Sequence, residues 1–474
     1  CGTSCMTDAR FVPASTFPGT ARTLYDWHSR PGALERLMPP WERAAVLSRT
    51  GTIEPGSEVV LQLHAGPVPY RWHARHLAAE PGVFFRDVQL RGPFARWTHT
   101  HRFTDTADGA RLEDEIDYAL PGHRFLPGWV HQRVEAELAR MFAHRHATLA
   151  GDLHLHARCS TRPLNLLISG ASGVLGAALK PLLTTGGHQV WTLVRRRPDR
   201  SRGEIHWNPE RGELNLAGLP PFDGVIHLAG DNIGEGRWTD AKKRRVIDSR
   251  VLGTGLLART LAALPVRPAV LLSASAVGFY GNCLDCCMRE EDPAGGDFIS
   301  DVCSLWEHAA TPAADAGIRT VFLRIGVVLS PRGGALQRLL ATRAAGFPRR
   351  FGQGDQYISW IAIDDMIAAI LHTLTCADLT GPVNIAAPRP VTNGELLQTL
   401  ARVVRRPLLP PVPARLLQAV YGQMAVEVLL GGCRVATDKL QRSGFTFRHP
   451  RLEGALSALL GRPPEDATSE GPRP

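Results

Sequence analysis

The most restrictive feature of the sequence is an apolar segment that leads into a glycine-rich turn and then into a helical pattern. Residues 164–169 read as a buried strand, residues 170–176 spell GASGVLG, and the helical pattern continues to Leu183. Such glycines let the backbone approach a pyrophosphate, and the helix N-terminus offers free N–H groups. The sequence therefore predicts a dinucleotide site, against the alternative of a glycine-rich turn without ligand. The predicted contacts are Gly170, Ser172, Gly173, Val174, Leu175 and Gly176.

The next predicted strand, residues 188–194, ends in three consecutive arginines. A site for NAD carries an acidic residue at this point to hold the ribose 2′-hydroxyl, whereas arginines suit a 2′-phosphate. Arg195 and Arg196 therefore predict a preference for NADP(H). The alternative is a run of solvent-exposed charged residues, but such a run would not need to lie at the end of this strand.

Two further apolar segments continue the pattern of a parallel α/β domain. Residues 222–230 read as the fourth strand, and its small residues fit beside the adenine and ribose. Residues 270–275 read as the fifth strand, which ends in hydroxyl side chains where such folds place catalytic groups. We expect Leu228, Ala229 and Ser273 to contact the cofactor.

Residues 164–461 resemble the extended short-chain dehydrogenase/reductase superfamily, in its atypical epimerase-like branch. The resemblance is carried by LAGD at 228–231, DSR at 248–250, SASAVGFYG at 273–281, LRIGVVL at 323–329, SWIAIDD at 359–365 and NIAAP at 384–388. It implies a Rossmann fold, an NADP cofactor and a substrate-side extension over about residues 383–461. It also implies that Arg195, Arg196, Leu228, Ala229 and Arg250 lie at cofactor-contacting positions.

The dehydrogenases of that superfamily use a tyrosine and a lysine four residues apart on one helix face, where the lysine lowers the pKa of the phenol. The corresponding positions here hold Phe298 and Val302. The chain has only four lysines, none of them between Lys243 and Lys439, and Tyr280 is the only tyrosine between residues 251 and 350. The usual catalytic pair is therefore absent.

Two interpretations remain open for this domain. In the first, the protein is an NADP(H)-linked reductase whose proton donor is Tyr280 or Ser275, since a phenol without a cationic neighbour stays protonated at neutral pH. Tyr280 packing against the nicotinamide without chemistry is an equally weighted alternative. In the second, the domain binds NADP(H) as a redox sensor or interaction module. Sugar epimerisation is the least favoured function, because it needs a reversible base at the missing pair.

The first 156 residues follow a different pattern, with short strand-like segments at 57–63, 70–74 and 82–88 separated by turn residues. A long helical pattern follows, in which Val130, Val134, Leu138 and Phe142 share one face. These features indicate an antiparallel meander that grips one amphipathic helix and encloses an apolar cavity.

Residues 7–156 resemble the helix-grip superfamily of START-like and polyketide-cyclase-like proteins. The matching segments are RPG at 30–32, PPWE at 39–42, GPF at 92–94 and WTH at 97–99. The resemblance implies an α+β domain that binds a hydrophobic small molecule, and we expect it to deliver an apolar substrate to the cofactor. His99 and His101 lie on one strand face, but no carboxylate or third histidine lies at a supporting spacing, so we predict surface or cavity-lining histidines and no metal site.

Composition bears on partners and compartment. The net charge is +9, but the arginines are spread along the chain without a nucleic-acid-binding motif, so no nucleic-acid partner is expected. No run of 18 apolar residues is present, and nine cysteines in 474 residues suggest a reducing, cytoplasmic setting. Cys283, Cys286 and Cys287 are expected to lie in a loop. We also expect a start at or upstream of Met6 and a disordered tail over 462–474.

One further segment, residues 406–432, is amphipathic. Leu416, Leu417, Val420 and Tyr421 are spaced along one helix face. Because the opposite face is not basic, we expect this face to pack into the core rather than onto a membrane or a partner.

Overall fold

The computed structural model describes residues 9–66, 68–122, 125–159, 162–341 and 348–462. The chain divides into two compact units, residues 1–158 with 184–187, and residues 159–183 with 188–474. The expected start at Met6 and nearly all of the expected disordered tail lie outside the described residues.

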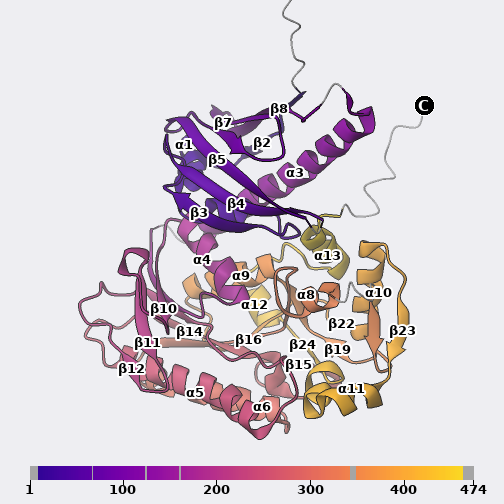
Figure 1. The fold of residues 1–474 in the computed structure, drawn as a ribbon. Helices are drawn as coiled ribbons and strands as arrows, with labels where there is room; N and C mark the ends of the chain where they lie inside the picture. The colour runs from indigo at the N-terminus through magenta and orange to yellow at the C-terminus, as the bar shows by residue number, and fades with distance from the viewer. Residues whose placement is uncertain (1–8, 67, 123–124, 160–161, 342–347, 463–474) are drawn as a thin grey trace, which may run out of the picture. The chain divides into compact units, whose positions relative to one another are not determined.

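The first unit is built on an antiparallel sheet with the strand order β1-β8-β7-β6-β5-β4-β3, and β2 also pairs with β8 (Figure 1). Its strands are β1 (Ala9–Phe11), β2 (Ala14–Phe17), β3 (Ala45–Thr50), β4 (Glu58–Ala65), β5 (Val68–Glu80), β6 (Phe84–Arg91), β7 (Arg96–Thr106) and β8 (Gly109–Ala119). Each of the three strands predicted here by alternation is present. The predicted antiparallel meander is therefore confirmed.

Three helices complete this unit: α1 (Ala21–Ser29), α2 (Ala33–Leu37) and α3 (Gly128–Cys159). The apolar face of α3 packs on the sheet, where Leu138 and Phe142 join a buried cluster with Trp97, Ile116 and Tyr118. The helix thus buries the face that the sequence periodicity predicts. This is the α+β helix-grip arrangement expected from the resemblance.

The second unit has an eight-stranded sheet with the order β12-β11-β10-β9-β13-β14-β16-β21. Its strands are β9 (Asn165–Ser169), β10 (Gln189–Val194), β11 (Glu204–Asn208), β12 (Glu213–Leu214), β13 (Gly224–His227), β14 (Val270–Ala276), β16 (Arg319–Ile325) and β21 (Gly381–Ile385). All the pairings are parallel except β11 with β12. The order reverses at β9, as in a dinucleotide-binding fold, so the carboxyl ends of β9 and β13 form the edge where a ligand binds.

Helices cover both faces of this sheet, with α5 and α6 on one side and α4 and α9 on the other (Figure 1). The helices are α4 (Val174–Thr185), α5 (Asp240–Ala262), α6 (Phe298–His308), α7 (Thr311–Asp315), α8 (Gly334–Ala341), α9 (Ile363–Thr375), α10 (Asn393–Val404), α11 (Ala414–Tyr421), α12 (Asp438–Arg442) and α13 (Leu452–Leu460). On the α5 face, Leu257 and Leu261 are buried against Leu167 and Leu193 of the sheet. Within the described part of the chain, no helix combines the length and the apolar character needed to cross a membrane.

Four two-stranded sheets extend the second unit: β15 (Cys283–Met288) with β24 (Cys433–Val435), β17 (Val327–Leu329) with β20 (Trp360–Ala362), β18 (Arg349–Phe351) with β23 (Leu409–Val412), and β19 (Tyr357–Ile358) with β22 (Val391–Thr392). Two expectations are wrong here. The cysteine cluster lies in strand β15 rather than in a loop, because residues far along the chain provide its pairing partner. On α11 only Leu417 is buried, while Leu416 and Val420 are 54% and 52% exposed, so that face does not enter the core.

A buried carboxylate helps to attach the C-terminal segment to the sheet domain. Asp365 on α9 accepts hydrogen bonds from the backbone N–H groups of Arg448 (2.7 Å) and His449 (2.9 Å). We predict that Asp365→Ala lowers the free energy of unfolding by about 3 kcal/mol, because hydrogen bonds to charged groups are lost and two amides are left unpaired. Urea unfolding measures the loss. The exposed Asp378→Ala is the matched control, and an equal effect of both variants would contradict this role.

Candidate functional site

The glycine turn lies between the ends of the two central strands. Gly170 follows β9 with a φ of +73°, and a Cβ atom built on it would lie 2.8 Å from the backbone nitrogen of Ala229. A Cβ on Gly176 would lie 2.4 Å from the carbonyl oxygen of Gly170. Side chains are thus excluded at both positions by backbone atoms, which do not move aside. The close approach of turn, helix and sheet explains the glycine spacing in the sequence.

The helix that follows the turn, α4, begins at Val174 and directs its first N–H groups toward the carboxyl edge of the sheet. Ser172, Gly173, Val174 and Leu175 therefore lie where the sequence predicts a pyrophosphate. Of the turn's N–H groups, that of Gly173 is bonded within the turn, to the Gly170 carbonyl at 3.0 Å.

The loop after β13 is held to the end of β9 by a buried serine–histidine pair. Ser169 Oγ lies 2.6 Å from His227 Nδ1, and the N–H of Leu228 donates to the same hydroxyl at 3.2 Å. This pair positions Leu228 and Ala229 beside the glycine turn. Neither Ser169 nor His227 was predicted from the sequence, because neither belongs to the glycine pattern. Burial lowers the pKa of His227 to about 4.

Arg250 lies beneath the same loop. The residue is 8% exposed, and its guanidinium stands over the ring of Trp306 and donates to the carbonyl of Val246 at 3.1 Å. A Cβ built on Gly230 would lie 3.3 Å from its Cζ atom. Among the described residues no carboxylate forms an ion pair with it. A buried guanidinium without a counter-charge is energetically costly, so its presence here favours an anionic ligand.

The predicted 2′-phosphate residues differ in their surroundings. Both are exposed and follow β10, which is the neighbour of β9 in the sheet. Arg196 donates to both carboxylate oxygens of Glu204, at 2.7 and 2.5 Å. This partner partly neutralises Arg196, so Arg195 is the better placed of the two to meet a phosphate.

The hydroxyl side chains of β14 point into the protein. Ser273 is fully buried. Ser275 Oγ donates to Glu307 Oε1 at 2.7 Å, and Glu307 also accepts two hydrogen bonds from Arg324, at 2.9 and 3.0 Å. The structure thus brings Ser275 into an ion-paired network, and its hydroxyl proton is directed at a carboxylate.

Tyr280 belongs to the same network. It is 1% exposed, its hydroxyl donates to Asn384 Oδ1 at 2.8 Å, and it accepts from Arg324 Nη1 at 2.9 Å. Burial raises the pKa of Tyr280 to about 12, against the opposing effect of Arg324. Of the two alternatives for Tyr280, these contacts favour the packing role. Its role as a proton donor stays a prediction.

The positions of the missing catalytic pair lie on α6, as the motif requires. Phe298 is the first residue of this helix, and Val302, one turn later, is buried. The ammonium group of Lys243, from α5, lies 5.0 Å from the centre of the Phe298 ring and donates to Gln423. A cation therefore approaches this position from a different helix, which sequence spacing alone does not reveal.

The strand order, the glycine turn and the charges at the carboxyl edge define a dinucleotide-binding protein of the short-chain dehydrogenase type. Residues 166–386 match the NAD dependent epimerase/dehydratase family, residues 18–147 match the polyketide cyclase/dehydrase and lipid transport family, and residues 412–459 match a domain of unknown function, DUF1731. An epimerase family protein of Mycobacterium bovis, Mb2239, is 41% identical over 296 residues, 62% of this chain and 97% of that protein. The chain belongs to this epimerase family.

Solved structures extend the similarity to both units. The nucleoside-diphosphate sugar epimerase from Corynebacterium glutamicum is 32% identical with a TM-score of 0.78, and the match covers 97% of this chain and 92% of that one. Human epimerase family protein SDR39U1, crystallised with NADPH, is 32% identical with a TM-score of 0.58, over 63% of this chain and 99% of the human one. The two-part architecture therefore recurs in a bacterial relative, while the human protein matches the sheet domain.

The buried His227 makes the stability of the sheet domain depend on pH. Its pKa of about 4 in the folded state is below its unfolded value near 6.5, so the unfolded chain binds more protons between these values. The stabilisation is complete above pH 6.5 and is lost as the pH falls toward 4. We predict that the free energy of unfolding falls by about 2 kcal/mol less in His227→Asn than in the unsubstituted protein when the pH is lowered from 7 to 5. Urea unfolding at both pH values tests this, and an unchanged pH dependence would refute it.

Proposed function

We propose that the second unit binds NADP(H) and reduces an apolar carbonyl compound bound by the first unit. The observation that carries the cofactor assignment is the buried Arg250 beside Gly230, in the loop after β13, without an ion-paired carboxylate among the described residues. The NADPH complex of the human relative supports the same cofactor.

The residues present fit an NADP(H) molecule. Gly170 and Gly176 leave a surface without side chains at the start of α4, where backbone N–H groups favour a pyrophosphate. Leu228 and Ala229 would contact the adenosine, and Arg195 would meet the 2′-phosphate. When bound, the cofactor supplies the hydride. The protein then has to exclude water and deliver a proton to the substrate oxygen.

Reduction requires a proton donor, whereas NADP(H) binding without turnover does not. Tyr280 and Ser275 are the predicted donors, yet both hydroxyl protons are directed at protein acceptors. This observation favours the second candidate function, an NADP(H)-binding redox sensor without turnover. Reduction requires Tyr280 or Ser275 to leave its present partner when substrate binds.

The choice between NADPH and NADH depends on Arg195. We expect NADPH to bind at least ten times more tightly than NADH, and Arg195→Glu to weaken NADPH binding by ten- to a hundredfold with little effect on NADH. The reason is that one charge-assisted phosphate contact becomes a repulsion, and each 1.4 kcal/mol corresponds to a factor of about ten. Fluorescence titration measures both constants. The exposed Arg211→Glu controls for net charge, and equal loss in both variants would contradict the assignment.

A substitution of Tyr280 distinguishes a structural role from a role as proton donor. If this residue is only structural, Tyr280→Phe loses the bonds to Asn384 and Arg324 and about 1–2 kcal/mol of stability, but keeps any NADPH oxidation. If it is the proton donor, the same variant loses activity by two or more orders of magnitude while NADPH binding is unchanged. NADPH oxidation with a panel of lipid- and polyketide-like carbonyls distinguishes the outcomes. Tight NADPH binding without oxidation of any of them would support the sensor function.

A further inference from the structure

Four ionisable side chains gather on the inner face of the antiparallel sheet of the first unit. They come from three adjacent strands: Asp87 from β6, His99 and His101 from β7, and Asp114 from β8. Strand register makes them neighbours, because Asp87 lies directly opposite His99 and His101 directly opposite Asp114. All four side chains are largely buried, Asp114 most completely, with 2% of its surface exposed. The cluster is unrelated to the glycine turn and to the network around Tyr280.

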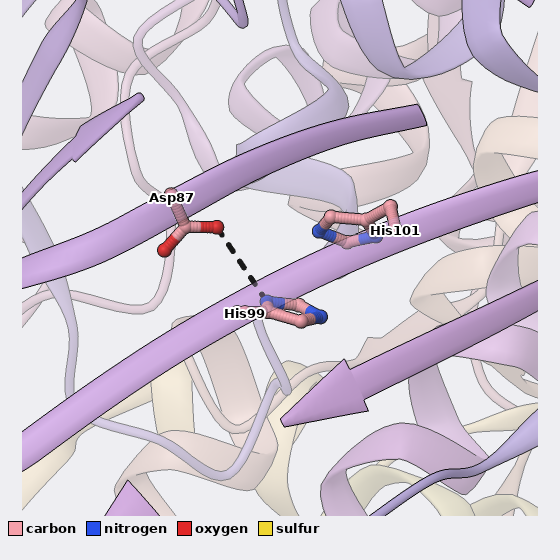
Figure 2. A group of neighbouring side chains, drawn as sticks. All are labelled: Asp87, His99 and His101. Atoms are coloured by element: carbon pink, nitrogen blue, oxygen red, sulfur yellow. Dashed lines mark ion pairs between the residues drawn. The ribbon is translucent and has the colours of Figure 1, made fainter. Parts of the chain in front are cut away.

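Three of these side chains are spaced to share one ion. Asp87, His99 and His101 each offer a ligand atom, and these atoms lie within 4.8 Å of one another (Figure 2). The distance from Asp87 Oδ2 to His99 Nδ1 is 3.6 Å, which is too long for a hydrogen bond. Ligand atoms bound about 2.1 Å from a common metal ion lie about 3.0–3.4 Å apart. The separation therefore fits two ligands of one ion better than it fits a hydrogen-bonded pair.

Asp114 fixes which nitrogen of His99 faces Asp87. His99 Nε2 lies 3.1 Å from Asp114 Oδ1 and must donate there, because an ionised carboxylate only accepts. In the neutral ring this leaves a lone pair on Nδ1, the atom directed at Asp87. A carboxylate that orients a histidine in this way is the usual outer partner of a metal-binding imidazole. His146 of α3 donates to the other oxygen of Asp114 at 2.8 Å and holds the carboxylate in place.

His101 completes the set. Its Nδ1 lies 2.5 Å from Asp114 Oδ1, so this nitrogen carries the ring proton and faces the carboxylate. The ring is 8% exposed and stacks on Phe85 with ring centres 4.0 Å apart, so its orientation is fixed by packing. Since Nδ1 is on the Asp114 side, we assign Nε2 as the ligand atom.

The charge of the cluster also calls for a cation. Asp87 and Asp114 are both buried among aromatic side chains, and Arg145 of α3 is the cation whose field reaches both of them. Burial raises the pKa of Asp87, because an ionised carboxylate is costly in a low-dielectric interior unless a cation compensates its charge. A divalent ion provides that compensation.

We propose that Asp87, His99 and His101 bind a divalent transition-metal ion, with Asp114 as the outer carboxylate. Two imidazole nitrogens and one carboxylate oxygen suit Zn²⁺, Fe²⁺ or Co²⁺, whereas Ca²⁺ and Mg²⁺ prefer oxygen ligands and Cu⁺ prefers sulfur. Three protein ligands leave at least one coordination position open. This position gives the first unit an anchor for an oxygen atom of its ligand. The proposal does not depend on the NADP(H) assignment.

The test uses full-length protein without a histidine tag, stripped with EDTA and titrated with Co²⁺, which reports its coordination by visible absorption. We expect about one bound ion per chain and a competing, tighter Zn²⁺ complex. Asp87→Asn and His99→Gln should each weaken binding by a hundredfold or more, and Asp114→Asn by ten- to a hundredfold. His73→Gln is the matched control, because His73 lies on β5 and pairs with Glu58 outside the cluster.

Two results would overturn the proposal. One is the absence of bound Co²⁺ at a tenfold excess, and the other is unchanged binding in Asp87→Asn, which would place the ion elsewhere, for example at the cysteines of β15. Circular dichroism of each variant monitors folding. Asp87 is the most exposed of the four side chains, at 14%, so Asp87→Asn decides the question if His99→Gln fails to fold.

Discussion

The close contact between the ends of β9 and β13 is the constraint on which the second unit depends. Gly170 lies so near the backbone of Ala229 that no side chain fits between them, and the Ser169–His227 pair fixes the distance from the interior. Because the two strands are parallel, their carboxyl ends meet where α4 begins. The positions of the glycine turn and of Leu228 and Ala229 follow from this contact between the two backbones.

A second, independent network of hydrogen bonds and an ion pair lies at the neighbouring part of the carboxyl edge of the sheet. The buried guanidinium of Arg324 is bound by Glu307 and Tyr280, and Asn384 then accepts from Tyr280. These groups come from β16, β21, α6 and the short helical turn Val277–Tyr280 that follows β14, so the network ties the strands together where the family's chemistry is expected. A buried cation of this kind needs nearly all of its partners. Ser275 and Tyr280 therefore both direct their hydroxyl protons at protein acceptors, and the proposed reduction requires one of them to change its partner.

Patterns local in sequence predicted the architecture, and contacts between distant segments determined the rest. The strand–turn–helix over 164–183 and the periodicity of α3 depend on residues that are close together in the sequence, so both were predictable. The pairing of Arg196 with Glu204, the approach of Lys243 to Phe298 and the exposed face of α11 depend on tertiary packing. The carboxylates near His99 were missed for the same reason, because Asp87 and Asp114 become its neighbours only through strand register.

Unbalanced buried charge points to a ligand in each unit. Arg324, Lys242 and Arg36 are buried cations, and each faces a carboxylate. Among the described residues Arg250 forms no ion pair, although the charge of Asp231 acts on it, and it lies beside Gly230 in the loop next to the predicted cofactor site. In the first unit the sign is reversed, since burial of Asp87 disfavours its carboxylate form unless a further cation is bound. The same electrostatic argument therefore supports a dinucleotide at the glycine turn and a metal ion on the antiparallel sheet. The second unit would then bind an anionic ligand, and the first unit a cation.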